Sequence, residues 1–155
     1  FQAFEGMEEG FRQRATSVTE LFADEVTAFV LVTAPREDSV AEASFFAQRL
    51  AEDDIDVRAL IVNRMHPPFG EADPAADEKA DGELRGAPGG AALADYHRAR
   101  ADLRRLASEE LANLAQLTAQ VSSAVIVYVP SLATDVHDVA GPNRVGESLL
   151  DPDPA

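Results

Sequence analysis

The stretch Thr27-Ala28-Phe29-Val30-Leu31-Val32-Thr33-Ala34-Pro35 decides the fold class of this chain. It is a short, nearly unbroken apolar run rich in β-branched residues, which is typical of a strand in a parallel sheet. We interpret residues 27–33 as a strand that is buried on both faces. Pro35 ends this strand, because proline has no backbone N–H to donate to a sheet.

A helix and a second strand are predicted after this stretch. Ser39-Val40-Ala41-Glu42 has the form of a capping box, in which Ser39 and Glu42 satisfy free amides where a helix begins. Apolar residues on one face continue this helix to about residue 52, and residues 57–63 form the next strand. A strand, helix and strand in this order make a right-handed crossover between parallel strands. The sequence therefore predicts an α/β fold.

Further elements are predicted on both sides of this unit. Apolar residues at spacings of three, four and seven indicate an amphipathic helix over 2–22 that packs on a larger body. A long helix over 91–120, a third strand over 124–129 and a short helix over 142–150 complete the predicted order. Residues 151–155 are expected to form a disordered tail.

Residues 64–91 have a different composition from the segments around them. They combine prolines, glycines and a run of carboxylates, which cannot bury enough apolar surface to offset the entropy of ordering. We therefore expect a long, mobile acidic loop. The following helix carries a patch of basic residues, which we interpret as a solvated helical face: Arg98, Arg100, Arg104 and Arg105.

Composition excludes several classes of function. The chain has 155 residues with a formal net charge of −15, so it is not expected to bind nucleic acid. It contains no cysteine, which excludes thiolate catalysis and sulfur-ligated zinc and fits a cytoplasmic location. No apolar run approaches the roughly 20 residues of a membrane-spanning helix. The single lysine, Lys79, lies outside any phosphate-binding motif.

Candidate binding residues follow the predicted strands, because ligands of open α/β sheets bind beyond the carboxyl ends of the strands. Asn63 ends the middle strand, and its carboxamide could pair with the edge of adenine through a donor and an acceptor. Alternatively, Asn63 only satisfies backbone amides at the strand end. Pro130, Ser131 and Leu132 follow the third strand at the same edge of the sheet.

Other potential sites are weak. Asp135, His137 and Asp138 could approach a cation, but the pattern lacks specificity and we interpret it as a capped, solvated loop. Neither His66 nor His97 has a partner at ligand spacing. We therefore predict no metal site and no catalytic residue in this chain.

Taken in order, four segments resemble the C-terminal half of the ArsA-type anion-transporting ATPases, a family that includes the targeting ATPase for tail-anchored membrane proteins. The preference for arginine over lysine resembles actinobacterial members. The resemblance covers about residues 18–150, and the segments are Thr27–Pro35, Ser39–Ala43, Val57–Arg64, and Val127–Pro130 with Asp135-Val136-His137.

The resemblance implies a partial P-loop ATPase sheet in which residues 1–150 supply the adenine side of an ATP site. In such proteins the asparagine after this strand pairs with adenine, a role that falls on Asn63. Pro130 would line the other side of the base, with Ser131 and Leu132 beside it. The family also implies Mg²⁺, a homodimer or a heterodimer with a related subunit, and a membrane-protein or transporter partner.

The chain departs from the family in one important respect. It has no glycine-rich loop with lysine, so it lacks the groups that bind the triphosphate and Mg²⁺, and we expect it not to hydrolyse ATP alone. Three hypotheses stay open: the C-terminal part of an ATPase whose other half lies upstream, a non-enzymatic interaction module, and a nucleotide-binding domain without catalysis. Because the paired cysteines of some relatives are absent, any dimer is not expected to be bridged by zinc.

Overall fold

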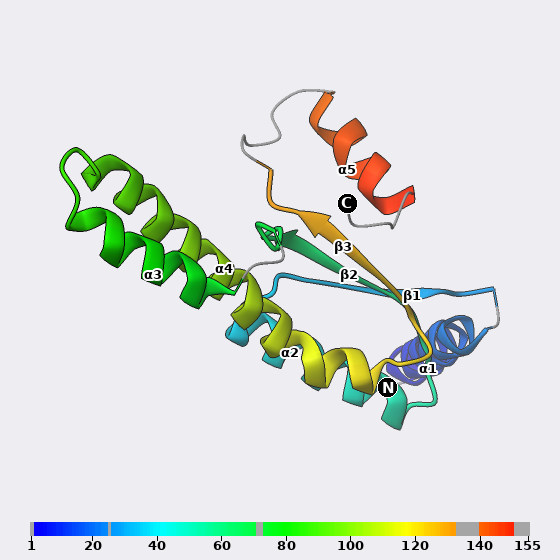
Figure 1. The fold of residues 1–155 in the computed structure, drawn as a ribbon. Coiled ribbons are helices and arrows are strands. Elements are labelled where there is room, and N and C mark those ends of the chain that lie inside the picture. Colours follow the sequence, from blue (N-terminus) through cyan, green and yellow to red (C-terminus); the bar gives the residue numbers. More distant parts are fainter. Residues whose placement is uncertain (1, 25, 71–72, 133–139, 151–155) are drawn as a thin grey trace.

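The computed structural model describes residues 2–24, 26–70, 73–132 and 140–150. It confirms the α/β class, with a three-stranded parallel sheet flanked by helices (Figure 1). The elements in chain order are α1 (Gln2–Ala23), β1 (Phe29–Thr33), α2 (Glu37–Glu52), β2 (Val57–Met65), α3 (Pro74–Arg85), α4 (Ala91–Gln120), β3 (Val125–Pro130) and α5 (Ala140–Leu150).

The strands lie in the order β1-β2-β3, so β2 is central and β1 and β3 form the edges of the described sheet. Leu31 lies beside Leu60 in the register of β1 and β2. In the register of β2 and β3, Asn63 lies beside Val129, and the pairing shifts between Asn63 and Met65. The carboxyl ends of β2 and β3 therefore meet at one edge, as the sequence predicted.

The core lies between one face of the sheet and helices α2 and α4, which both cover that face (Figure 1). Strand side chains alternate between faces, so Leu60 and Val62 point into this layer and are fully buried. Leu114 and Leu117 of α4 are buried to the same degree. This packing fixes the direction in which every second side chain of β2 points.

The opposite face of the sheet is only partly covered by the described residues. Helix α5 packs on it against β3 (Figure 1), where Val127 and Val129 are buried. On β1, by contrast, Val30 and Val32 are 48% and 63% exposed. The prediction that this strand is buried on both faces is therefore wrong for the described structure, because α2 and α4 lie on the same face.

Helix α1 forms as predicted but packs little on the rest of the described chain. Phe22, at its C-terminal end, contacts Phe29 of β1 edge to face, with 5.7 Å between the ring centroids. Further toward the N-terminus, Phe11 is 72% exposed. The apolar stripe was thus a sound indicator of a helix, whereas the expected packing on a larger body is not present among the described residues.

Residues 64–91 do not form one long loop. Strand β2 continues to Met65, and α3 occupies residues 74–85. Asp73 is the N-cap of α3 and accepts a hydrogen bond from the backbone N–H of Ala75 at 3.0 Å, while Pro74 takes the first helical position. The expectation of a loop is wrong because it considered only apolar burial, and this helix is held mainly by charge.

A buried carboxylate joins α3 to α4. Asp77 is 1% exposed, and it forms ion pairs with Arg100 and Arg104 of α4. Its Oδ1 also lies 2.8 Å from Nδ1 of His97. The hydrogen bond from Arg100, followed by that from His97, holds the pKa of Asp77 well below its ordinary value of 3.8, against the opposing effect of burial.

A second carboxylate extends this contact along the two helices. Asp81 is 6% exposed and accepts hydrogen bonds from Arg98 and Arg85, which lower its pKa. The interpretation of the basic patch as a solvated face is therefore wrong for these residues, and Arg104 is itself buried. Acidic residues of α3 and arginines of α4 therefore compensate each other's charge between the two helices.

The predicted capping box is also wrong. Helix α2 begins at Glu37 with Arg36 as its N-cap, and no side chain caps it. Asp38 instead accepts a hydrogen bond from the backbone N–H of Ser39 at 2.9 Å, and this bond, followed by one from Arg36, lowers its pKa. Ser39 and Glu42 therefore do not form the reciprocal hydrogen bonds of a capping box, and the Ser39 hydroxyl lies 3.4 Å from the carboxylate of Asp38. The prediction of a helix over 142–150 is confirmed by α5.

Candidate functional site

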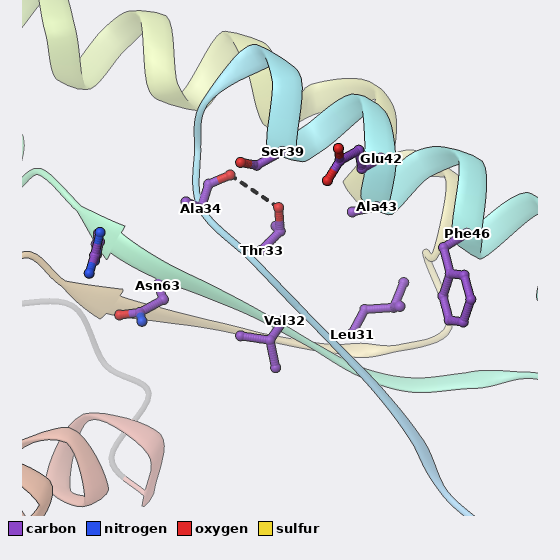
Figure 2. Close-up of a pocket in the computed structure, with 10 residues that line it drawn as sticks. Leu31, Val32, Thr33, Ala34, Ser39, Glu42, Ala43, Phe46 and Asn63 are labelled. Carbon is purple, nitrogen blue, oxygen red and sulfur yellow. Dashed lines mark hydrogen bonds between the residues drawn. The ribbon is translucent and has the colours of Figure 1, made fainter.

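A groove lies at the carboxyl end of β1, between this strand, the end of β2 and helix α2 (Figure 2). Its volume is about 580 Å³. This is the edge of the sheet at which ligands bind in open α/β folds. The residues that line the groove are Leu31, Val32, Thr33, Ala34, Ser39, Glu42, Ala43, Phe46, Asn63 and Arg64.

The residues that line the groove come from both faces of the sheet. Figure 2 shows Leu31 and Thr33 on the side of α2, and Val32 and Asn63 on the other side. The hydroxyl of Thr33 donates to the carbonyl oxygen of Ala34 at 3.1 Å. Leu31 and Thr33 are buried, whereas Val32 and Asn63 are exposed.

Asn63 reaches this groove with its carboxamide free. The residue is exposed, and among the described residues its side chain has no hydrogen-bond partner. Such a bond would be needed if Asn63 only satisfied backbone amides at the strand end. Because a carboxamide offers a donor and an acceptor side by side, it is available here to a ligand that presents the complementary pair.

The backbone changes direction directly after Asn63. Arg64 has φ of 65°, in the left-handed region that residues other than glycine rarely adopt. The shift in register between Asn63 and Met65 coincides with this residue. One residue is thus inserted relative to β3, and such bulges re-aim neighbouring side chains. Asn63 and Arg64 are both exposed as a result.

Pro130, Ser131 and Leu132 lie near Asn63 but do not line the groove. Pro130 lies beside Met65, and the backbone N–H of Ser131 donates to the carbonyl oxygen of Met65 at 2.7 Å. Asn63 is therefore placed between the groove, which lies toward β1, and these residues, of which Pro130 ends β3 and Ser131 and Leu132 follow it. The four predicted site residues share one edge of the sheet, and only Asn63 takes part in the groove.

Four lining residues on α2 were not predicted as site residues. They recur on one face of the helix at spacings of three and four, a pattern that is visible in the sequence but that is also typical of capping and core packing. These residues are Ser39, Glu42, Ala43 and Phe46.

The side chains that line the groove suit a neutral polar group of a ligand rather than a metal cation. Glu42 and Arg64 are its charged residues, with opposite signs. Within the described ranges, no three potential metal ligands come together. The alternative site at Asp135, His137 and Asp138 lies outside the described residues.

No helix in the described part of the chain is both long and apolar enough to cross a membrane.

Part of the chain is similar in sequence to a known protein. No family model matches the chain. Over 61 residues the chain is 43% identical to the protein named ATPase GET3B of Arabidopsis thaliana. The matched residues are 39% of this chain and only 15% of that protein. The chain therefore has partial similarity to an ATPase.

Proposed function

We propose that this chain supplies the adenine-binding side of an ArsA-type ATPase that couples ATP binding and hydrolysis to the transport or targeting of a cargo. The observation that carries the proposal is the free carboxamide of Asn63, which is exposed at the carboxyl edge of a parallel sheet and lines a groove. The partial match to an ATPase supports the same class of function.

Adenine fits this position by its chemistry. Its edge presents an N–H donor beside a ring-nitrogen acceptor, which is the complement of the Asn63 carboxamide. On the proposed model, Pro130 forms a wall on the far side of the base, with Ser131 and Leu132 beside it. The backbone bond between Ser131 and Met65 supports this model, because it keeps the ends of β2 and β3 together.

The described residues do not fit the triphosphate and Mg²⁺ of ATP. The groove has a single basic residue, Arg64, and the sequence has no glycine-rich loop with lysine. We therefore propose that residues outside this sequence bind the phosphates and the metal, and that a cytoplasmic dimer, with a copy or a related subunit, is the working form. A membrane protein or transporter is the proposed partner, and nucleic acid is not.

An interaction module without catalysis is the second candidate function. It is favoured by exposed apolar side chains along α4, where such residues normally pack inside the protein: Leu93, Tyr96, Leu103, Leu106 and Leu111. A fluorescent probe for apolar surface should bind the full-length protein if this face is used. Absence of binding, both with and without ATP, would remove this candidate.

The principal test of the proposed function is the affinity for ATP of Asn63→Ala in the full-length protein. We expect binding to weaken by about 1–3 kcal/mol, the value of a good bidentate contact to a base. Asn143→Ala is a matched control, because Asn143 is an exposed carboxamide on α5 that does not line the groove. Equal ATP affinity for Asn63→Ala and the parent protein would refute the proposed role.

A further inference from the structure

The buried carboxylate of Glu110 on α4 binds His66, which lies just beyond the end of β2. Glu110 is 7% exposed, and its Oε2 accepts a hydrogen bond from the backbone N–H of His66 at 2.8 Å. Its Oε1 lies 2.7 Å from Nδ1 of the same residue. Both carboxylate oxygens are therefore committed to His66, which lies three residues after Asn63.

Two other side chains of α4 make comparable contacts with the segments that follow β1 and β2. Arg104 donates from Nε to the carbonyl oxygen of Phe69 at 3.0 Å. Asn113 donates from Nδ2 to the carbonyl oxygen of Pro35 at 3.2 Å. Helix α4 thus holds the backbone on both sides of the groove through polar side chains, in addition to its apolar packing beneath the sheet.

The end of β2 needs such an anchor because regular pairing is interrupted there. Arg64 adopts a left-handed conformation where the register shifts, and the Asn63 side chain has no partner among the described residues. The direction of the carboxamide is consequently set by the residues on either side. On the C-terminal side the first fixed points are Met65, bonded to Ser131, and His66, bonded to Glu110.

We propose that Glu110 is a positioning residue for base recognition: by holding His66, it fixes the turn at Arg64 and so the direction in which Asn63 presents its carboxamide. This inference rests on the proposed function, since it assigns Glu110 a role in that same site. Loss of the carboxylate would leave the backbone N–H of His66 without its acceptor and release the end of β2.

The positioning itself can be tested without nucleotide. Nuclear magnetic resonance spectra of the full-length protein should show shifted backbone and carboxamide signals of Asn63 in Glu110→Ala. Glu109→Ala is the matched control, because Glu109 is the exposed neighbour of Glu110 on the same helix. Glu110→Gln should restore the signals, since glutamine can accept from the His66 N–H and donate to Nδ1. Unchanged Asn63 signals in Glu110→Ala would overturn the proposal.

A second variant covers the case in which Glu110→Ala does not fold. His66→Ala removes the ring contact but keeps the backbone N–H, so a smaller displacement of the same Asn63 signals is expected. If His66→Ala leaves these signals in place, the proposal is equally overturned.

Nucleotide binding separates a positioning role from a general loss of structure. Glu110→Ala should weaken ATP binding by about threefold or more but leave binding of inorganic tripolyphosphate unchanged, and it should add nothing to Asn63→Ala, because the two residues act through one contact. Equal losses for both ligands, or additive losses, would contradict the positioning role. If Asn63→Ala binds ATP normally, the proposed function fails, and the ligand-free spectra still decide whether Glu110 positions Asn63.

Discussion

Asp77 of α3 and Arg104 of α4 form an ion pair in which the side chains are only 2% and 7% exposed. Arg104 also donates to the carbonyl oxygen of Phe69, so a single guanidinium joins the two helices to the segment after β2. Few large apolar residues support this contact, since Leu84 is the only one on α3. Charge pairing therefore largely determines whether α3 packs on α4.

Replacement of the buried carboxylate should loosen this pair of helices. In Asp77→Asn, Arg100 and Arg104 would lose the charge that compensates them, and an uncompensated buried charge is strongly destabilising. We expect a lower melting temperature by circular dichroism than for the parent protein. The control is Glu83→Gln on the same helix, where the side chain is exposed and its pairing with Lys79 spans 3.9 Å. Equal melting temperatures for the two variants would contradict the account.

Acid should weaken the same contact. The pKa values of Asp77 and Asp81 lie below the ordinary 3.8 because of hydrogen bonds from Arg100 and Arg98, respectively. As the pH falls, the unfolded chain takes up these protons before the folded chain does, so the stabilisation is present above about pH 4 and declines below it. The melting temperature of the parent should therefore approach that of Asp77→Asn as the pH is lowered from about 6 to about 3. A constant difference across this range would speak against the pairing.

The central strand should be the most sensitive part of the core. Leu60 is fully buried between the sheet and the helices, so Leu60→Ala should lower the free energy of unfolding by about 2–5 kcal/mol. Val32→Ala makes a good comparison, because Val32 lies on the neighbouring strand but is 63% exposed. Chemical denaturation should show a much smaller loss for Val32→Ala. Similar losses at both positions would contradict the described layer arrangement.

The left-handed backbone conformation of Arg64, near the end of β2, can be tested by substitution. Glycine adopts φ near 65° without strain, so Arg64→Gly should change the free energy of unfolding by less than about 1 kcal/mol. A β-branched residue is poorly tolerated there, and Arg64→Val should be more destabilising than Arg64→Gly. Urea denaturation of the two variants provides the measurement. The reverse order would show that Arg64 does not adopt this conformation.

The strands and the long helix were predictable because their signals are local. The apolar run at 27–33 and the strand at 57–63 correspond to β1 and β2, and α4 occupies the predicted residues 91–120. Parallel pairing followed from the crossover rule. The burial of each face was not predictable in the same way, because it depends on where helices far apart in the sequence come to lie.

Helix α3 shows why the remaining errors arose. Its composition is acidic and poor in large apolar residues, so a criterion of apolar burial indicated a loop. Asp73 followed by Pro74 is a local start signal for a helix, and it indicates where α3 begins. Pairing of Asp77 and Asp81 with arginines about 20 residues away is a contact between elements, which no local pattern contains.

Only part of the site was predictable, from the rule that ligands of open α/β sheets bind beyond the carboxyl ends of the strands. Asn63 was selected because it ends the central strand, and the structure places it in a groove at that edge. The groove residues on α2 and the hydrogen bond between His66 and Glu110 depend on tertiary packing. These contacts could not have been inferred from spacing in the sequence.

The most direct test of the central claim is to follow the side-chain carboxamide signals of Asn63 by nuclear magnetic resonance while ATP is added to the full-length protein. If the carboxamide pairs with adenine, ATP should shift these signals and inorganic tripolyphosphate should not. Signals that stay in place at saturating ATP, or that move equally with tripolyphosphate, would contradict base recognition by Asn63.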